Sequence, residues 1–348
     1  MRRGMVVAGL VVLVGVLLAP AGSLLYESGG PEACANCHEM GRQVELWSGS
    51  AHQEVKCGAC HGDALTMDAR VHWTNARRVA EHWMGRIGEE PRLGEGQVLE
   101  MMSRCEGCHE QEFAAWQAGP HAATYERLFL DEKHNHTRHL MNDCLRCHGA
   151  HAEGAIGDVV APLDTKGPWR LVREELRGQP AIPCMQCHAV HREGQVLGRK
   201  RLEAKMAGRQ QETHRPGLGF YDRRSRAGVR AGLLRVPKME DNGRVLRMSA
   251  DGRQAVCYQC HAPLAGRQAG SGDDRTPKGV HEGLSCLACH EQHRGTTRAS
   301  CATCHPRLSN CGRDVETMDT TFANAKSGHN VHWVACADCH AKGVPRRR

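Results

Sequence analysis

Residues 34–38 read Cys-Ala-Asn-Cys-His, and the same spacing, Cys-x-x-Cys-His, returns eight more times along the 348 residues of the chain. The nine copies use 18 of the 19 cysteines. Their cysteines are Cys34 and Cys37, Cys57 and Cys60, Cys105 and Cys108, Cys144 and Cys147, Cys184 and Cys187, Cys257 and Cys260, Cys286 and Cys289, Cys301 and Cys304, and Cys336 and Cys339. The histidines that close them are His38, His61, His109, His148, His188, His261, His290, His305 and His340. Random placement of 19 cysteines and 23 histidines would give about 0.07 copies, so the repetition is not accidental.

This spacing is the attachment signature of c-type haem. Two thiols form thioethers with the vinyl groups of one porphyrin, and the adjacent imidazole faces the iron. Paired cysteines also bind zinc or form disulfides, but neither use requires a histidine directly after the second cysteine. The sequence therefore predicts nine covalently attached haem c groups. Cys311 lies outside the motifs and is expected to be a buried, inert thiol.

Nine haems leave about 39 residues for each, too few for nine separate domains. Aromatic residues make up 4% of the chain, and Gly (39) and Pro (14) are frequent. We therefore expect a mainly α fold with much irregular coil, in which short helices wrap a haem array with little or no sheet. Porphyrins would supply much of the buried apolar surface. The clearest helix is predicted over residues 66–88, where Met67, Val71, Val79, Trp83 and Ile87 form one stripe that would pack against haem.

Residues 1–30 read as a targeting or anchoring segment. Arg2 and Arg3 precede an apolar run over residues 5–25, which is long enough to span a bilayer. A signal peptide cleaved after the small residues around Pro20 is the alternative. We expect an uncleaved anchor that contacts membrane lipid and holds an exported chain on the periplasmic side of the cytoplasmic membrane. Cleavage would instead release a soluble periplasmic or extracellular protein.

The chain is expected to have four parts: the anchor (1–30), a five-haem region (31–191), a basic insertion without cysteine (192–256) and a four-haem region (257–348). The net charge is +7, and residues 192–253 alone carry 16 Lys and Arg against 7 Asp and Glu, a net +9. This insertion could neutralise haem propionates, or it could dock an acidic redox partner. Nucleic-acid binding is not expected, because no recognition module is present.

Fourteen histidines lie outside the motifs, and eight of them recur at fixed places. Three lie five residues before a motif, one lies four before, three lie three residues after a motif histidine, and His121 follows Trp116 as His52 follows Trp47. These predicted sixth ligands are His52, His121, His139, His151, His191, His281, His293 and His332. The ninth ligand is expected to be Met40, because methionine is the other common axial ligand.

The remaining histidines have no assigned ligand role: His72, His82, His134, His136, His214 and His329. His72 or His82 could replace one of the eight. His134, His136 and His139 could form a metal or proton-delivery cluster. A ligand at His139 beside two solvated histidines is the preferred interpretation.

The segment Cys34-Ala-Asn-Cys-His-Glu-Met40, just after a single apolar span, resembles the NapC/NirT family of membrane-anchored cytochromes. The likeness continues through Trp47, His52 and the motif at Cys57, and it covers about residues 1–62. It implies a periplasmic quinol dehydrogenase in which the methionine, Met40 here, is a ligand of the first haem. The family carries fewer haems than the nine motifs of this chain, so the resemblance ends there.

The sequence thus favours a nonahaem cytochrome that carries electrons from membrane quinol to a periplasmic or extracellular redox partner, possessing quinol dehydrogenase activity if quinol is the donor. One alternative is a reductase or oxidase that acts on a small nitrogen or sulfur oxyanion at an open haem. A second alternative is a protomer of an extracellular haem wire. No catalytic side chain is assigned, and no Cys-x-x-Cys-Lys motif occurs.

Overall fold

The structure is a computed structural model that describes residues 28–62, 69–86, 93–135, 139–167, 169–188, 190–191, 217–234, 236, 238–261, 274–294, 301–305, 330–339 and 342, with isolated positions before residue 28. The chain divides into two compact units. The first contains Met1–Cys108 and Ala189–Gly198, and the second contains His109–His188 and Arg199–Arg348.

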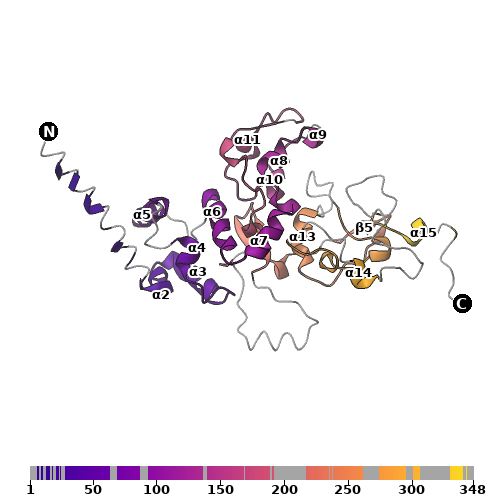
Figure 1. The fold of residues 1–348 in the computed structure, drawn as a ribbon, viewed down its shortest axis with the longest axis horizontal. Coiled ribbons are helices and arrows are strands. Elements are labelled where there is room, and N and C mark those ends of the chain that lie inside the picture. The colour runs from indigo at the N-terminus through magenta and orange to yellow at the C-terminus, as the bar shows by residue number, and fades with distance from the viewer. Residues whose placement is uncertain are drawn as a thin grey trace. The chain divides into compact units, whose positions relative to one another are not determined.

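The first unit is helical (Figure 1). Its helices are α2 (Gly30–Ala35), α3 (His38–Ser48), α4 (Cys57–His61), α5 (Ala69–Trp83) and α6 (Glu95–Glu106). Proline at the start of α2 has the backbone angle that a first helical turn requires. α5 corresponds to the helix predicted over residues 66–88.

The second unit combines short helices with irregular chain. Its α-helices are α7 (Glu110–Gln117), α8 (Tyr125–Phe129), α9 (Glu132–Asn135), α10 (Cys144–Cys147), α11 (Ile156–Val159), α13 (Gln254–His261), α14 (Cys301–Cys304) and α15 (Cys336–Cys339). Its 3-10 turns are η1 (Pro120–Ala122), η2 (Glu174–Leu176), η3 (Cys184–Gln186), η4 (Ala231–Leu233), η5 (Gly279–His281) and η6 (Cys286–Ala288).

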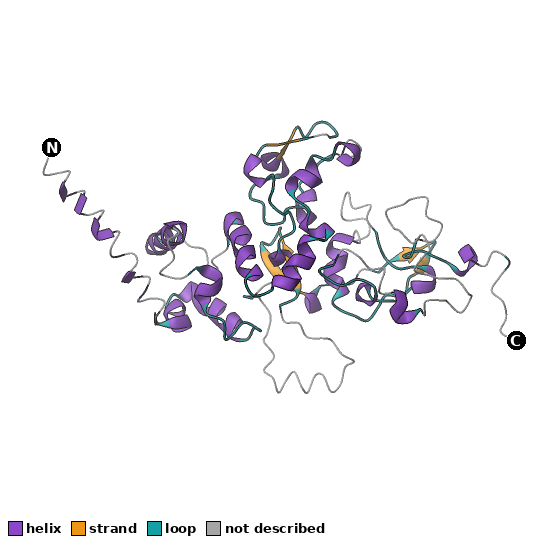
Figure 2. Cartoon of the chain, in the orientation of Figure 1, coloured by secondary structure: helices purple, strands orange, loops and turns teal. Residues whose placement is uncertain are grey.

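Strands form only two-stranded antiparallel pairs in the described residues. These are β1 (Val160–Ala161) with β2 (Arg170–Leu171), β3 (Gly219–Asp222) with β4 (Ala227–Arg230), and β5 (Glu240–Asp241) with β6 (Arg244–Val245). Figure 2 shows how little of the chain they occupy beside helix and loop. The predicted fold class, mainly α with much coil and little sheet, is confirmed.

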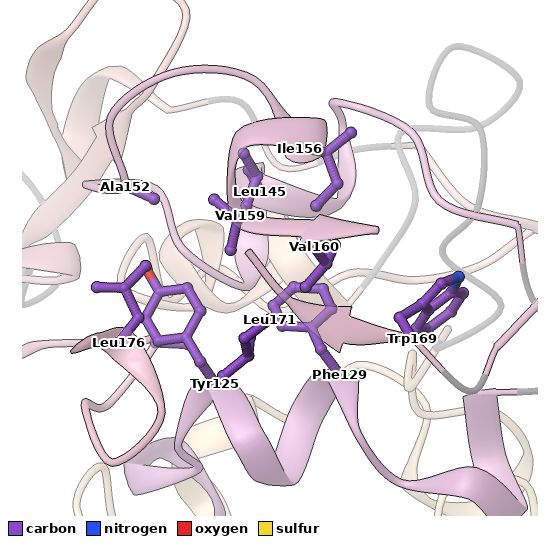
Figure 3. Close-up of a cluster of buried hydrophobic side chains, with 11 residues drawn as sticks. Tyr125, Phe129, Leu145, Ala152, Ile156, Val159, Val160, Trp169, Leu171 and Leu176 are labelled. Carbon is purple, nitrogen blue, oxygen red and sulfur yellow. The ribbon is translucent and has the colours of Figure 1, made fainter. Parts of the chain in front are cut away.

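A conventional hydrophobic core forms between residues 125 and 181. We had expected porphyrins to supply much of the buried apolar surface. Figure 3 shows side chains from α8, α10, α11 and the β1–β2 pair converging on one another. The cluster consists of Tyr125, Phe129, Leu145, Ala152, Ile156, Val159, Val160, Trp169, Leu171, Leu176 and Ala181. Because three of the chain's few aromatic residues gather here, this region can bury apolar surface with side chains alone.

Val79 and Trp83 of α5, which we expected to pack against haem, are exposed and are not covered by other described parts of the chain. Met67 and Ile87 lie outside the described residues, as do residues 192–216, Cys311, His136, His214 and His329. Most of the predicted anchor is also outside them. Within the part of the chain that the structure describes, no helix is long and apolar enough to cross a membrane.

Candidate haem-binding sites

Six of the nine Cys-x-x-Cys-His motifs begin on a single helical turn, and the motif at Cys257 lies within α13. The motif at Cys34 spans the break between α2 and α3, and the motif at Cys105 begins at the end of α6. In α4, α10, η3, η6, α14 and α15 the first cysteine begins the turn. In four motifs the backbone N–H of the histidine donates to the carbonyl of the first cysteine: His148 to Cys144 at 3.0 Å, His188 to Cys184 at 2.9 Å, His290 to Cys286 at 2.9 Å and His305 to Cys301 at 2.8 Å. Residues three and four apart share one helix face, so both thiols and the imidazole can address one porphyrin.

The thiols themselves are available for thioether formation. No disulfide joins the seventeen motif cysteines whose side chains the structure describes. The side chain of Cys339 lies outside the described residues. Among described residues, no three His, Cys, Asp or Glu side chains form a metal-binding group.

Five motif histidines each face a second histidine from a different part of the chain. The ring centroids are 6.0 Å apart for His61 and His191, 6.1 Å for His121 and His261, 6.0 Å for His188 and His293, 6.3 Å for His281 and His305, and 6.1 Å for His290 and His332. In every pair one member closes a Cys-x-x-Cys-His motif and the other is a predicted sixth ligand.

This separation fits a metal ion between the two rings. A metal–nitrogen bond to imidazole is about 2 Å long, so two opposed ligand nitrogens lie about 4 Å apart and their ring centroids about 6 Å apart. A direct hydrogen bond between the two imidazoles would bring the rings closer, since its donor and acceptor lie about 3 Å apart. The donor set therefore fits bis-histidine haem at five of the nine motifs.

Two of the added histidines are oriented through Nδ1. Nδ1 of His191 lies 2.7 Å from the carbonyl oxygen of Gln43, and Nδ1 of His281 lies 2.9 Å from that of Val331. A carbonyl can only accept, so Nδ1 is the protonated nitrogen in both rings. Nε2 then carries the lone pair that an iron requires.

Burial keeps three of the paired imidazoles, those of His61, His121 and His191, in the neutral form that binds metal by lowering their pKa. Burial, followed by His191 and Arg78, lowers the pKa of His61 to about 4. The pKa of His191 is lowered by burial, although the Gln43 carbonyl opposes the shift. Burial, followed by His261, lowers the pKa of His121. At neutral pH these three imidazoles therefore require little or no loss of protons before ligation.

His151, another predicted sixth ligand, lies in a second kind of environment. Its ring stacks on Tyr221 with centroids 4.0 Å apart and planes at 21°. Its Nε2 is buried and has no hydrogen-bond partner among the described residues. Burial, opposed by a hydrogen bond with the Met185 backbone, lowers the pKa of His151 to about 4. A buried nitrogen with a free lone pair is suited to an iron, although no ring pair with a motif histidine is seen here.

Met40, His52 and His139 are the predicted ligands that remain. Met40 is half-buried on α3, and His52 is half-buried with its N–H donating to Ser50 Oγ at 3.1 Å. His139 is exposed. The motif histidines His109 and His148 are also exposed, the side chain of His38 is not described, and His340 lies outside the described residues. Their ligand roles remain predictions.

Three features that position the sites were not anticipated from the sequence. Tyr221 stacks on His151, and Arg223 from the same hairpin donates to the carbonyls of Gly149, Ala150, Ala152 and Gly154. Nδ1 of His82 lies 2.7 Å from Oε1 of the buried Glu39, beside the first motif. Residues 217–230 contain two aromatic residues and four arginines, and this content was the only sequence signal that the β3–β4 hairpin contacts a ligand site.

Neighbouring motifs lie close together within each unit. In the first unit, burial and then the nearby Cys57 raise the pKa of Cys34, and burial and then Cys105 raise the pKa of Cys60. The attachment site at Cys57 therefore lies beside the site at Cys34 and beside the site at Cys105.

In the second unit the motif at Cys257 lies between several others. A hydrogen bond with Cys147, followed by burial and by Cys187, raises the pKa of Cys260. A hydrogen bond with Cys257, followed by burial, raises the pKa of Cys286. Arg146 Nη2 also donates to Gln259 Oε1 at 2.7 Å. Three attachment sites therefore adjoin the one at Cys257.

Comparison with known proteins agrees with this chemistry. A family model described as cytochrome c554 and c-prime matches residues 104–168, and one described as cytochrome c7 and related cytochrome c matches residues 246–306. No curated protein and no solved structure matches the chain. The two matches and the nine motifs support a multihaem c-type cytochrome with covalently bound haem c, and they suggest a role in electron transfer. Neither match reaches residues 1–62, so the NapC/NirT resemblance remains a prediction.

Proposed function

We propose that the chain is an exported nonahaem cytochrome that carries electrons from membrane quinol to a soluble redox partner. The observation that carries the proposal is the set of five histidine pairs with centroids 6.0–6.3 Å apart. Haem iron with two axial histidines exchanges single electrons without binding substrate. The residues therefore favour conduction over a reductase, which needs an iron with an open position.

The adjacency of the motifs supports a path within each unit. The attachment sites at Cys34, Cys57 and Cys105 would form one series. The site at Cys257 would be a junction for those at Cys144, Cys184 and Cys286. The pairs His290–His332 and His281–His305 extend the second series toward the motifs near the C-terminus.

A membrane donor is supported by the N-terminal run and by the first motif. Within that run the described positions Val6, Leu10, Leu13 and Leu18 are helical and exposed. An exposed apolar helix is suited to lipid. Met40 on α3 lies two residues after His38 of the first motif and would distinguish that haem from the others, because methionine raises the potential of haem relative to histidine.

The proposed electron acceptor is a protein with an acidic surface. The segment 192–253 carries a net +9, which would steer such a partner. Electron transfer to the partner should slow as salt rises, because a Debye length of about 10 Å at 0.1 M screens the attraction.

The experiment that tests the function compares the wild-type holoprotein with Met40→His in lipid vesicles, using a soluble hydroquinone and dithionite as reductants. We expect Met40→His to shift one haem spectrally and to slow reduction by hydroquinone, with reduction by dithionite unchanged. His214→Ala, which removes a histidine without an assigned role, should match the wild type in all three measurements. Equal hydroquinone kinetics and equal spectra in wild type and Met40→His would overturn the quinol assignment.

A further inference from the structure

Helix α5 has two faces of opposite character. One face joins it to the helices beside the haem motifs: Arg78 Nη2 donates to Gln97 Oε1 of α6 at 3.2 Å, and His82 Nδ1 lies 2.7 Å from Glu39 Oε1 of α3. The other face exposes three large apolar side chains. Trp73 is 70% exposed, Trp83 is 82% exposed and Met84, just after the helix, is 53% exposed.

The geometry of the helix separates these two faces. At about 100° per residue, Trp73 lies about 180° from His82 and about 140° from Arg78. Trp83 lies about 100° from His82 and about 140° from Arg78 by the same reckoning. The exposed tryptophans therefore lie away from the contacts that α5 makes with α3 and α6. The small residues Ala76 and Ala80 between the tryptophans are exposed as well.

We propose that this face, formed by Trp73, Trp83 and Met84, lies in the headgroup layer of a bilayer that contains anionic lipid. The indole ring is amphipathic and is enriched where membrane meets water. Apart from Arg78 on the other face, residues 69–86 carry three arginines and one glutamate, a net +2, which complements anionic headgroups. Arg77, whose side chain is 61% exposed and lies 3.6 Å from the Glu81 carboxylate, neighbours the apolar face. An amphipathic helix with these features binds in the plane of the membrane.

The inference rests on the membrane location in the proposed function, and it adds a second contact besides the N-terminal run. Residues 5–25 belong to the same compact unit as α5, so one membrane could serve both. Two weak membrane signals act together more strongly than either alone. Contact along α5 would hold the first unit against the surface, where a lipid-soluble donor is found.

Photolabelling tests this contact in the complete holoprotein. The protein is bound to vesicles of phosphatidylethanolamine and phosphatidylglycerol that contain a trace of phospholipid bearing a diazirine near the glycerol, and it is illuminated and digested with trypsin. We expect label on the peptides 71–77 and 79–86, which contain Trp73, Trp83 and Met84. The peptide that contains Trp333, which is 46% exposed in the other unit, should remain unlabelled.

The matched variant replaces Trp73, Trp83 and Met84 by glutamine, which leaves the charge unchanged and removes the apolar surface. Label on α5 should fall at least fivefold while the haem content stays equal to that of the wild type. Labelled residues 5–25 with unlabelled α5 would overturn the inference and leave the proposed function intact. Absence of label from both segments would instead remove the membrane location itself. Cross-links from α5 to a second polypeptide would replace lipid by a protein partner and also overturn the inference.

Discussion

At the residue scale, the imidazole of His191 is expected to determine the coordination of the haem at Cys57. Its Nδ1 is held by the Gln43 carbonyl, and its ring faces His61 with the centroids 6.0 Å apart. We expect His191→Ala to leave the haem at Cys57 with five ligands, because no other histidine ring is seen opposite His61 in the described residues. The reduced variant should then bind one equivalent of carbon monoxide more than the wild type and show a high-spin signal. His214→Ala is the control, and carbon monoxide binding equal to that of the wild type would remove His191 from the ligand set.

Tyr221 tests whether an aromatic neighbour sets the orientation of a ligand. The Tyr221 and His151 rings stack at 4.0 Å, and an aromatic pair of this kind contributes about 1 kcal/mol. Tyr221→Leu should change the electron paramagnetic resonance signal of one low-spin haem, because the imidazole plane is no longer fixed. Tyr221→Phe keeps the ring and should retain the wild-type signal. If both variants behave alike, Tyr221 acts through general packing and not through the stack.

At the scale of elements, η5 and the segment 330–334 form one assembly that carries ligands of two haems. The N–H of Val280 donates to the Val334 carbonyl at 3.0 Å, and the N–H of Lys278 donates to that of His332 at 2.6 Å. Gly279 has φ +65°, and a Cβ there would collide with the carbonyl oxygen of Val334. The close approach of these backbones therefore requires glycine.

Gly279→Ala should destabilise this assembly by about 3 kcal/mol, the sum of a left-handed backbone and a steric clash. We expect low-spin signal to be lost from two haems together, since His281 and His332 lie on the two sides of the contact. Gly243 has φ +78° but nothing within 4 Å of an added Cβ, so Gly243→Ala is the matched control and should cost only about 1 kcal/mol. Loss of one haem signal alone, or equal effects of the two substitutions, would contradict the assembly.

The sequence predicts well the helical turns that neighbouring residues form, and it predicts poorly which residues far apart in the chain come together. The spacing within a motif is a property of one helical turn, so α4, α10 and α15 could be expected from it. The pairing of His121 with His261 joins residues far apart in the chain, and no sequence pattern near either residue indicates that the other is its partner. Likewise the stack of Tyr221 on His151 depends on where the β3–β4 hairpin packs. The repeated spacings identify histidines that serve as candidate sixth ligands. Only the folded chain shows which motif histidine each of them faces.

At the scale of the whole molecule, the account requires nine haems on one chain. Intact-mass measurement of the purified protein should give the polypeptide plus nine haems, because all nine motifs are complete. Haem-free chain should lose most of its folded structure in circular dichroism, since ligand binding to the native state supplies stability. The region around residues 125–181 should keep some structure, because its core consists of side chains. A mass short of nine haems would disprove the count.

The most direct test of the central claim is an anomalous-difference map at the iron edge from crystals of the holoprotein. The account predicts nine iron peaks, of which five lie midway between His61 and His191, His121 and His261, His188 and His293, His281 and His305, and His290 and His332. Iron at those motifs with another sixth ligand, or with an open position, would contradict the bis-histidine conduit and favour a catalytic haem.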